Sequence, residues 1–270
     1  MIDLHMHSSC SDGQHSPEKL VEIAETYGIT HLALTDHDTI SGLSAARTAA
    51  QKHGIRFLCG IEISTNVRHQ HILGLGVSPA SDVLRDACEQ FEQRRIKRMH
   101  GILDALNGLG IALDPEQVTR YASGQVGKPH IARAMMDKGY VSSVSEAFEK
   151  YLSLPPVRAV KDSKISDADA IALIHAAGGH AILAHPLELS DSMDAIVERM
   201  DCLRDMGLDG VEAFYRTHTP EQCAFFSAYA ERYGLIVTGG SDYHGELIKP
   251  DVLPGIPPYP QILSQTALCW

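Results

Sequence analysis

The 270-residue sequence has few aromatic side chains and no long apolar run. Phe, Trp and Tyr make up 6% of the chain, and Trp occurs once. No apolar run approaches ~18 residues, which excludes a membrane-spanning helix. No basic and apolar leader precedes the first stretch of strand character. We therefore expect a globular cytoplasmic protein that has no membrane partner.

Paired cysteines and an excess of positive charge are also missing. The six cysteines form no CxxC pair, so a disulfide framework and a zinc ribbon are both excluded. The net charge of −11 argues against non-specific binding of long nucleic acid. Residues 85–164 differ from this average, because they contain 13 Lys or Arg against 10 Asp or Glu. A mildly basic segment in an acidic chain suits a metal centre with phosphate-binding side chains beside it.

Short apolar runs alternate with helical patterns, which is typical of repeated β/α units. The pattern "PEKLVEIAETYG" predicts a helix with Pro17 at its start and Gly28 at its end. Three more segments follow the same rules: "SGLSAARTAAQKHG", "ISDADAIALIHAAGG" and "TPEQCAFFSAYAERYG". The predicted strands number seven and are "IDLHM", "THLALTD", "FLCGIEIS", "HILGLGV", "HAILAHP", "DGVEAFY" and "LIVTGGSD".

The alternation stops between about Leu84 and Lys164, where helical patterns follow one another without a clear strand. We interpret this segment as an all-helical insertion that ends at the linker "LPPVRAVKD". The predicted organisation is a β/α barrel formed by residues 1–84 and 165–270, interrupted by the helical insertion of residues 85–164.

Side chains that bind metals recur where the predicted strands end. His5 and His7 are two residues apart, so they point to one face of an extended strand. Asp242 and His244 repeat this spacing near the end of the last strand. Sites in β/α barrels lie at the carboxyl ends of the strands. The full candidate ligand set is His5, His7, Asp12, His37, Glu62, His71, His185, Asp242 and His244.

Nine ligands exceed the four to six that one ion takes. We therefore expect two or three divalent ions, with Glu62 able to bridge them. Nitrogen and oxygen donors without thiolate suit Mn²⁺, Zn²⁺ or Fe²⁺, and Mn²⁺ is the ion we expect. Adjacent ions of this kind serve the hydrolysis of phosphate esters.

The motifs "DLHMHS", "LALTDHDTISG", "GIEIS", "HILGLG", "AHP" and "GGSDYH" resemble, in order, those of the PHP family (polymerase and histidinol phosphatase). The resemblance implies an α/β fold, a distorted seven-stranded β/α (TIM-like) barrel, with two or three metal ions at the carboxyl ends of its strands. The nine candidate residues then occupy the ligand positions. The catalytic set that the resemblance implies is His5, His7, Asp12, His37, Glu62, His185 and Asp242, to which we add His218.

The helical insertion indicates which subgroup of the PHP family the sequence resembles. Its segment "GKPHIARAMMDKGYVSSVSEAFEKYL" resembles the subgroup that contains nucleoside 3′,5′-bisphosphate phosphatases and 5′-to-3′ exoribonucleases. Pro129 at a helix start leaves free backbone N–H groups, a ready anion site. Arg216 and His218 follow a strand, so we expect them at the rim of the active site. The candidate substrate-binding residues are Lys128, His130, Arg133, Arg158, Arg216 and His218.

The resulting hypothesis is a metal-dependent phosphatase that removes the 3′-phosphate from nucleoside 3′,5′-bisphosphates by attack of a metal-bound hydroxide. His218 or a metal-bound water is expected to protonate the leaving oxygen. The first alternative is a 5′-to-3′ exonuclease acting on short 5′-phosphorylated RNA or DNA, which requires an open groove with aromatic stacking surfaces. The second is a non-catalytic metal-binding module, which predicts missing ligands. The partner is thus a small nucleotide, with short RNA as the alternative.

Overall fold

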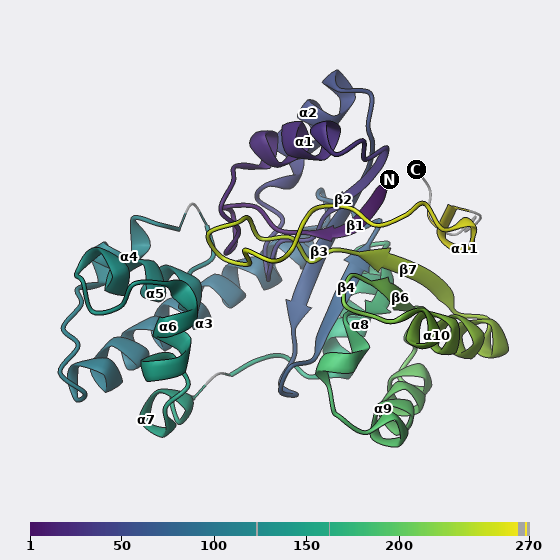
Figure 1. Cartoon of the computed structure of the whole chain (residues 1–270). Coiled ribbons are helices and arrows are strands. Elements are labelled where there is room, and N and C mark those ends of the chain that lie inside the picture. Colours follow the sequence, from purple (N-terminus) through teal and green to yellow (C-terminus); the bar gives the residue numbers. More distant parts are fainter. Residues whose placement is uncertain (123, 162, 264–267, 269–270) are drawn as a thin grey trace.

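The computed structural model describes residues 1–122, 124–161, 163–263 and 268. Its centre is a seven-stranded sheet in chain order that curls into a nearly closed barrel (Figure 1). All seven predicted strands are confirmed. They are β1 (Ile2–Met6), β2 (His31–Leu34), β3 (Arg56–Ser64), β4 (His71–Leu75), β5 (His180–Leu183), β6 (Gly210–Tyr215) and β7 (Ile236–Gly240).

One strand departs from the parallel arrangement. β4 runs antiparallel to both β3 and β5, whereas the other neighbours in the sheet are parallel. Only the short connection between Ser64 and His71 joins β3 to β4, and a connection of this length permits a hairpin but not a crossover. As a result, the first residue of β4 lies at the same edge as the carboxyl ends of the parallel strands.

The barrel closes between β7 and β1. The backbone N–H of Asp242 donates to the carbonyl oxygen of His5 at 2.8 Å, and the N–H of His7 donates to the carbonyl of Tyr243 at 3.0 Å. Gly240 permits this close approach, because an added Cβ would lie 2.4 Å from the Cβ of His5. The first and last strands therefore bring their chemistry-bearing residues to one place.

The helices outside the sheet begin at clear sequence signals. The Ser16 side chain caps α1 (Pro17–Thr26) by accepting from the Lys19 N–H, and Thr219 and Gln222 form a capping box at α10 (Pro220–Tyr233). Figure 1 shows α1 and α2 together on one side of the sheet and α8 to α10 on another. The other helices here include α2 (Leu43–Lys52) and α8 (Asp167–Ala176), which were predicted from the sequence. The helices α9 (Met193–Asp205) and α11 (Pro260–Leu263) and a 3-10 turn (Pro186–Glu188) were not predicted.

The segment between β4 and α8 folds as helices that stand apart from the sheet in Figure 1. Its buried apolar residues from Met99 onward form a cluster of their own. Helix α3 joins both parts: Leu84 and Phe91 pack in the barrel core, and Met99 and Leu106 pack in the second cluster. The elements are α3 (Asp82–Asn107), α4 (Pro115–Thr119), α5 (Lys128–Asp137), α6 (Val144–Ala147), a π-helical turn (Phe148–Leu152) and α7 (Pro155–Arg158).

The strands bury both apolar and charged side chains. All five residues of β1 are buried. Glu62 on β3 and Glu212 on β6, each a single acid within an otherwise uncharged stretch of strand, are 1% and 0% exposed. Acids are rarely buried unless they are paired, so these two positions mark the functional end of the barrel. Among the described residues, no helix is both long and apolar enough to cross a membrane.

Candidate metal centre

Glu62 lies at the centre of the predicted ligand set. β3 carries its side chain to the carboxyl edge of the sheet, where Oε2 faces three imidazoles. This oxygen lies 3.3 Å from His5 Nε2 and 3.1 Å from His7 Nε2. It also lies 3.1 Å from Nδ1 of His37, which follows β2. One carboxylate oxygen thus connects the ends of three neighbouring strands.

The second oxygen of Glu62 faces the other half of the barrel. Oε1 lies 2.9 Å from His71 Nδ1 and 3.1 Å from His185 Nε2. His71 reaches this place because β4 is antiparallel, so the start of that strand meets the end of β5. The carboxylate of Glu62 therefore has imidazoles on both sides, as a bridging ligand would.

The last three predicted ligands complete the cluster on the side of β1 and β7. Asp242 Oδ1 lies 3.3 Å from His7 Nε2, and His244 Nδ1 lies 3.2 Å from the same oxygen. His244 Nε2 lies 3.3 Å from Asp12 Oδ1. All nine predicted ligands are therefore in one connected group.

Two of these side chains depend on unusual backbone conformations. His185 and Asp242, each the second residue after the end of β5 or β7, have φ angles of 28° and 56° in the left-handed region. Non-glycine residues adopt this region rarely, and they do so mostly where a site requires it. The sharp bend at each strand end turns the imidazole and the carboxylate into the barrel mouth.

The buried polar atoms of the cluster fit divalent ions. A buried polar atom without a partner costs roughly 1–3 kcal/mol, so a group of them needs an explanation. Within the described ranges, the atoms that lack a hydrogen-bond partner include His5 Nε2, His7 Nδ1 and Nε2, Asp12 Oδ1, His37 Nδ1, Glu62 Oε2 and His185 Nδ1. Their nitrogen and oxygen chemistry suits Mn²⁺, Zn²⁺ or Fe²⁺.

The donor atoms also lie close enough together to share ions. Three groups have donor atoms within 4.8 Å of one another. His185 belongs to none of them and joins the cluster through Glu62 and through His71 Nδ1, 3.2 Å away. The groups are His7, Asp12, His37 and His244; His5, His7, Glu62 and Asp242; and His37, Glu62 and His71.

Burial and neighbouring charges shift the pKa values of side chains in the cluster. Burial favours the neutral form of Glu62, but the surrounding imidazoles, led by His37, hold its pKa well below the usual range. Burial alone would lower the pKa of His7, yet Asp242 and Glu62 raise it to about 9. Metal binding to such a cluster displaces protons from its imidazoles.

Several residues outside the predicted set hydrogen-bond to the predicted ligands and orient them. Glu212 accepts from His5 Nδ1 at 3.1 Å and from the backbone N–H of His185 at 2.8 Å. Such carboxylate partners fix the tautomer of a metal-binding imidazole. Asp242 Oδ2 accepts from the Tyr215 hydroxyl at 2.9 Å and from Lys249 Nζ at 2.5 Å. A register shift in β6 between Glu212 and Phe214 turns Tyr215 toward the cluster.

A pocket of about 170 Å³, here called the basic pocket, adjoins the cluster. The predicted ligands Asp12, His37 and His71 lie on its wall, together with Lys128 at the start of α5. The sequence analysis missed the other cations in this wall. They are Arg94, Arg95 and Arg98 from α3, and Lys164.

The predicted substrate-binding residues of the insertion occupy different surroundings. His130 is 1% exposed, and its Nδ1 accepts from the Gly127 N–H at 2.9 Å. Burial lowers the pKa of His130 to about 4. The Arg133 guanidinium stacks over Tyr121 at 4.5 Å, and Arg133 lines none of the described pockets that contain predicted ligands. Arg158 lines a groove of about 460 Å³, here called the outer groove.

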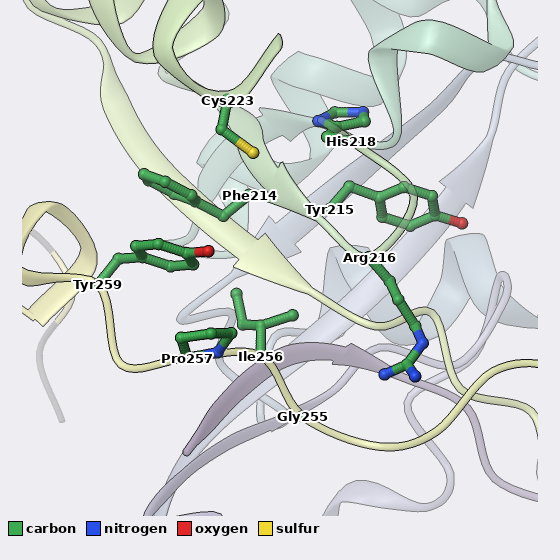
Figure 2. A pocket seen from close by; sticks show the side chains of 9 residues that line it. All are labelled: Phe214, Tyr215, Arg216, His218, Cys223, Gly255, Ile256, Pro257 and Tyr259. Carbon is green, nitrogen blue, oxygen red and sulfur yellow. The ribbon is translucent and has the colours of Figure 1, made fainter. Parts of the chain in front are cut away.

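Arg216 and His218 diverge after β6, as Figure 2 shows. Arg216 donates to the Leu253 carbonyl at 2.8 Å and lines a pocket of about 240 Å³ that contains none of the nine predicted ligands. His218 lies 5.5 Å from the Tyr215 ring, and its Nδ1 donates to the Ala213 carbonyl at 3.0 Å. Burial lowers the pKa of His218, which favours a neutral ring whose Nε2 carries a lone pair. The role of His218 as general acid stays a prediction.

The fold and the cluster define a class: β/α-barrel proteins with a histidine and carboxylate metal centre at the carboxyl ends of the strands. The PHP domain matches residues 3–156. The chain belongs to the PHP domain family.

Relatives along nearly the whole chain carry three different activities in their names. A phosphoribosyl 1,2-cyclic phosphate 1,2-diphosphodiesterase of Eggerthella lenta is 36% identical over 90% of this chain and 94% of its own. A 3′,5′-nucleoside bisphosphate phosphatase of Chromobacterium violaceum is 34% identical over 90% and 87%. A 5′-3′ exoribonuclease of Haemophilus influenzae is 36% identical over 90% and 89%. All three are phosphoesterases.

Two solved structures share this fold along nearly the whole chain. An amidohydrolase from Chromobacterium violaceum superposes with a TM-score of 0.85 at 32% identity, covering 95% of this chain and 92% of its own. A protein of Bifidobacterium adolescentis described as a metal-dependent phosphoesterase gives 0.82 at 29% identity, covering 95% and 90%. The chain is a metal-dependent phosphoesterase.

Proposed function

We propose that the protein removes the 3′-phosphate from nucleoside 3′,5′-bisphosphates, such as adenosine 3′,5′-bisphosphate, and releases the 5′-monophosphate. The observation that carries this proposal is the shared wall of the metal cluster and the basic pocket. Asp12, His37 and His71 belong to both. A substrate with two phosphates places one at the cluster and the other among the cations.

The nine clustered residues, with Glu62 at their centre, would hold two or three divalent ions. Such ions would supply a hydroxide nucleophile at neutral pH and would neutralise the charge of the phosphoryl group. The chain itself orients this centre through Glu212, Tyr215 and Lys249, which fix the imidazole of His5 and the carboxylate of Asp242.

The second phosphate is bound by cations of the basic pocket. The Arg98 guanidinium offers a planar set of donors that matches phosphate oxygens, and Lys128 adds charge at the start of α5. Two neighbours hold the wall in place. Arg95 donates to Asp38 Oδ2 through Nε at 2.8 Å, and Arg94 donates to the same oxygen at 3.2 Å. The spacing between the two phosphates then selects the substrate.

A second candidate, 5′-to-3′ exonuclease activity on short 5′-phosphorylated RNA, is favoured by the outer groove. His71, Arg98, Lys128 and Lys164 line both the basic pocket and this groove. The groove extends the cationic surface to Arg68 and Arg158 and includes the aromatic ring of Phe148. These features suit further nucleotides of a short strand.

Product analysis distinguishes the two candidates. Mn²⁺-loaded protein is incubated in parallel with adenosine 3′,5′-bisphosphate and with a short 5′-phosphorylated RNA. Phosphate release from the bisphosphate with intact RNA supports the proposed phosphatase. Shortening of the RNA at comparable efficiency supports the exonuclease. Failure to hydrolyse either substrate contradicts both.

A further inference from the structure

A pocket of about 350 Å³, here called the apolar pocket, adjoins the basic pocket and shares two lining residues with it. Asp12 and Pro129 line both pockets, and Asp12 also belongs to the metal cluster, so both pockets adjoin that cluster. His244 and Lys249 form the remaining polar wall near the cluster. The apolar walls are Pro129, Val144, Phe148 and Ile248.

We propose that the apolar pocket binds the nucleobase of the substrate, with the base stacked on the ring of Phe148. This inference rests on the proposed function, because it assigns a place to the part of a nucleotide that carries no phosphate. The basic pocket offers cations for phosphate, whereas the apolar pocket offers a flat ring and aliphatic side chains, which suit a planar base.

Phe148 is well placed for stacking. It begins the π-helical turn between α6 and α7, and its side chain is half-buried. It packs at the margin of the second apolar cluster and also lines both the apolar pocket and the outer groove. A ring held on one side by its own core and open on the other is a rigid stacking surface.

The rim of the apolar pocket adds hydrogen-bonding groups. Ser145 and Glu149 are exposed and lie on its wall. The Glu149 carboxylate accepts hydrogen bonds, as an exocyclic amino group of a base requires.

The pocket of Figure 2 is the obvious competitor. Its walls include the stacked rings of Phe214 and Tyr259, whose centroids are 3.9 Å apart. These rings already face each other, and none of the nine predicted ligands lines that pocket. Tyr259 therefore provides a matched control for Phe148.

The test compares Phe148→Leu, Phe148→Tyr and Tyr259→Leu with the unchanged protein. Each is assayed with adenosine 3′,5′-bisphosphate and with an abasic tetrahydrofuran 3,5-bisphosphate. Base stacking is worth roughly 1–3 kcal/mol, so Phe148→Leu is expected to lower kcat/KM for the nucleotide by about 5- to 150-fold. Its kcat/KM for the abasic compound stays unchanged, which also shows that the variant is folded. Phe148→Tyr and Tyr259→Leu keep nucleotide activity near that of the unchanged protein.

Equal effects of Phe148→Leu on both substrates, or an effect of Tyr259→Leu alone, would overturn the proposal. Binding of adenosine 5′-monophosphate to the Mn²⁺-loaded protein, measured by calorimetry, separates this inference from the proposed reaction. If neither bisphosphate is hydrolysed, the proposed function fails, and the binding comparison still decides the base site. The base site is supported if Phe148→Leu binds adenosine 5′-monophosphate more weakly and Tyr259→Leu does not. Unchanged binding by Phe148→Leu contradicts the base site.

Discussion

The Oε2 atom of Glu62 lies 3.1 Å from the Nε2 atom of His7 inside the mouth of the barrel. These residues come from β3 and the end of β1, which are separated by β2 in the sheet. The contact shows that the cluster is built across strands and not along one motif. It also makes Glu62 the residue on which the arrangement of the imidazoles most depends.

Substitution of Glu62 by Gln is expected to abolish hydrolysis and to reduce the number of bound ions. Gln keeps the shape of the side chain but removes the negative charge that faces the surrounding imidazoles. Metal content by mass spectrometry and phosphate release on the same samples measure both effects. A Glu62→Gln protein with full metal content and full activity would refute the bridging role.

Lys249 is expected to act through Asp242. Lys249→Met removes the ammonium that lies 2.5 Å from Asp242 Oδ2, so the carboxylate loses a partner that orients it. Partners of this kind contribute about 10–100-fold to metal affinity. Titration of phosphatase activity with Mn²⁺ should show a midpoint shifted upward by about that factor. Lys249→Arg, which keeps the charge, serves as the control, and an unshifted midpoint for Lys249→Met would contradict the role.

Arg98 and Arg216 form a matched pair for substrate binding. Arg98→Ala removes a cation of the basic pocket, and hydrogen bonds to charged groups are worth about 1.5–3 kcal/mol, so KM for the bisphosphate should rise about 10- to 150-fold. Arg216→Ala should change KM less than about twofold, since that guanidinium donates to the Leu253 carbonyl. Steady-state kinetics measures both effects. A larger rise in KM for Arg216→Ala than for Arg98→Ala would instead support the prediction from the sequence that Arg216 binds the substrate.

His130 makes the stability of the protein depend on pH in a defined direction. Its pKa is lowered from 6.5 to about 4 by burial, so the unfolded chain binds the proton more tightly than the folded one. The free energy of unfolding should therefore fall as the pH drops from about 6.5 toward 4. His130→Asn keeps an acceptor for the Gly127 N–H but does not titrate, so it should reduce this slope in urea unfolding. An equal slope in both proteins would show that His130 does not contribute.

The strand ends could be predicted from the sequence because their signals are local. His5 and His7 alternate with apolar residues, and Glu62 interrupts a buried run, so each reveals its position without tertiary information. Glu212 carries the same signal within "GVEAFY" and could have been found in that way. The antiparallel direction of β4 was equally accessible from the short connection to β3.

The basic pocket could not be predicted in the same way. Arg94, Arg95 and Arg98 lie on α3, a charged helix whose exposed and site-facing positions look alike in sequence. Only the packing of α3 across both apolar clusters places these arginines in one pocket wall with three of the predicted ligands. Conversely, Arg216 follows a strand that reaches the site, but the register shift in β6 directs Tyr215 inward in its place.

The most direct test of the account is the return of activity to chelator-treated protein as Mn²⁺ is added in known amounts. Hydrolysis of adenosine 3′,5′-bisphosphate is followed beside the number of ions bound per chain. We predict no hydrolysis before metal is added, and full activity once two or three ions are bound. Full activity in the chelator-treated protein, or none when the sites are filled, would contradict the account.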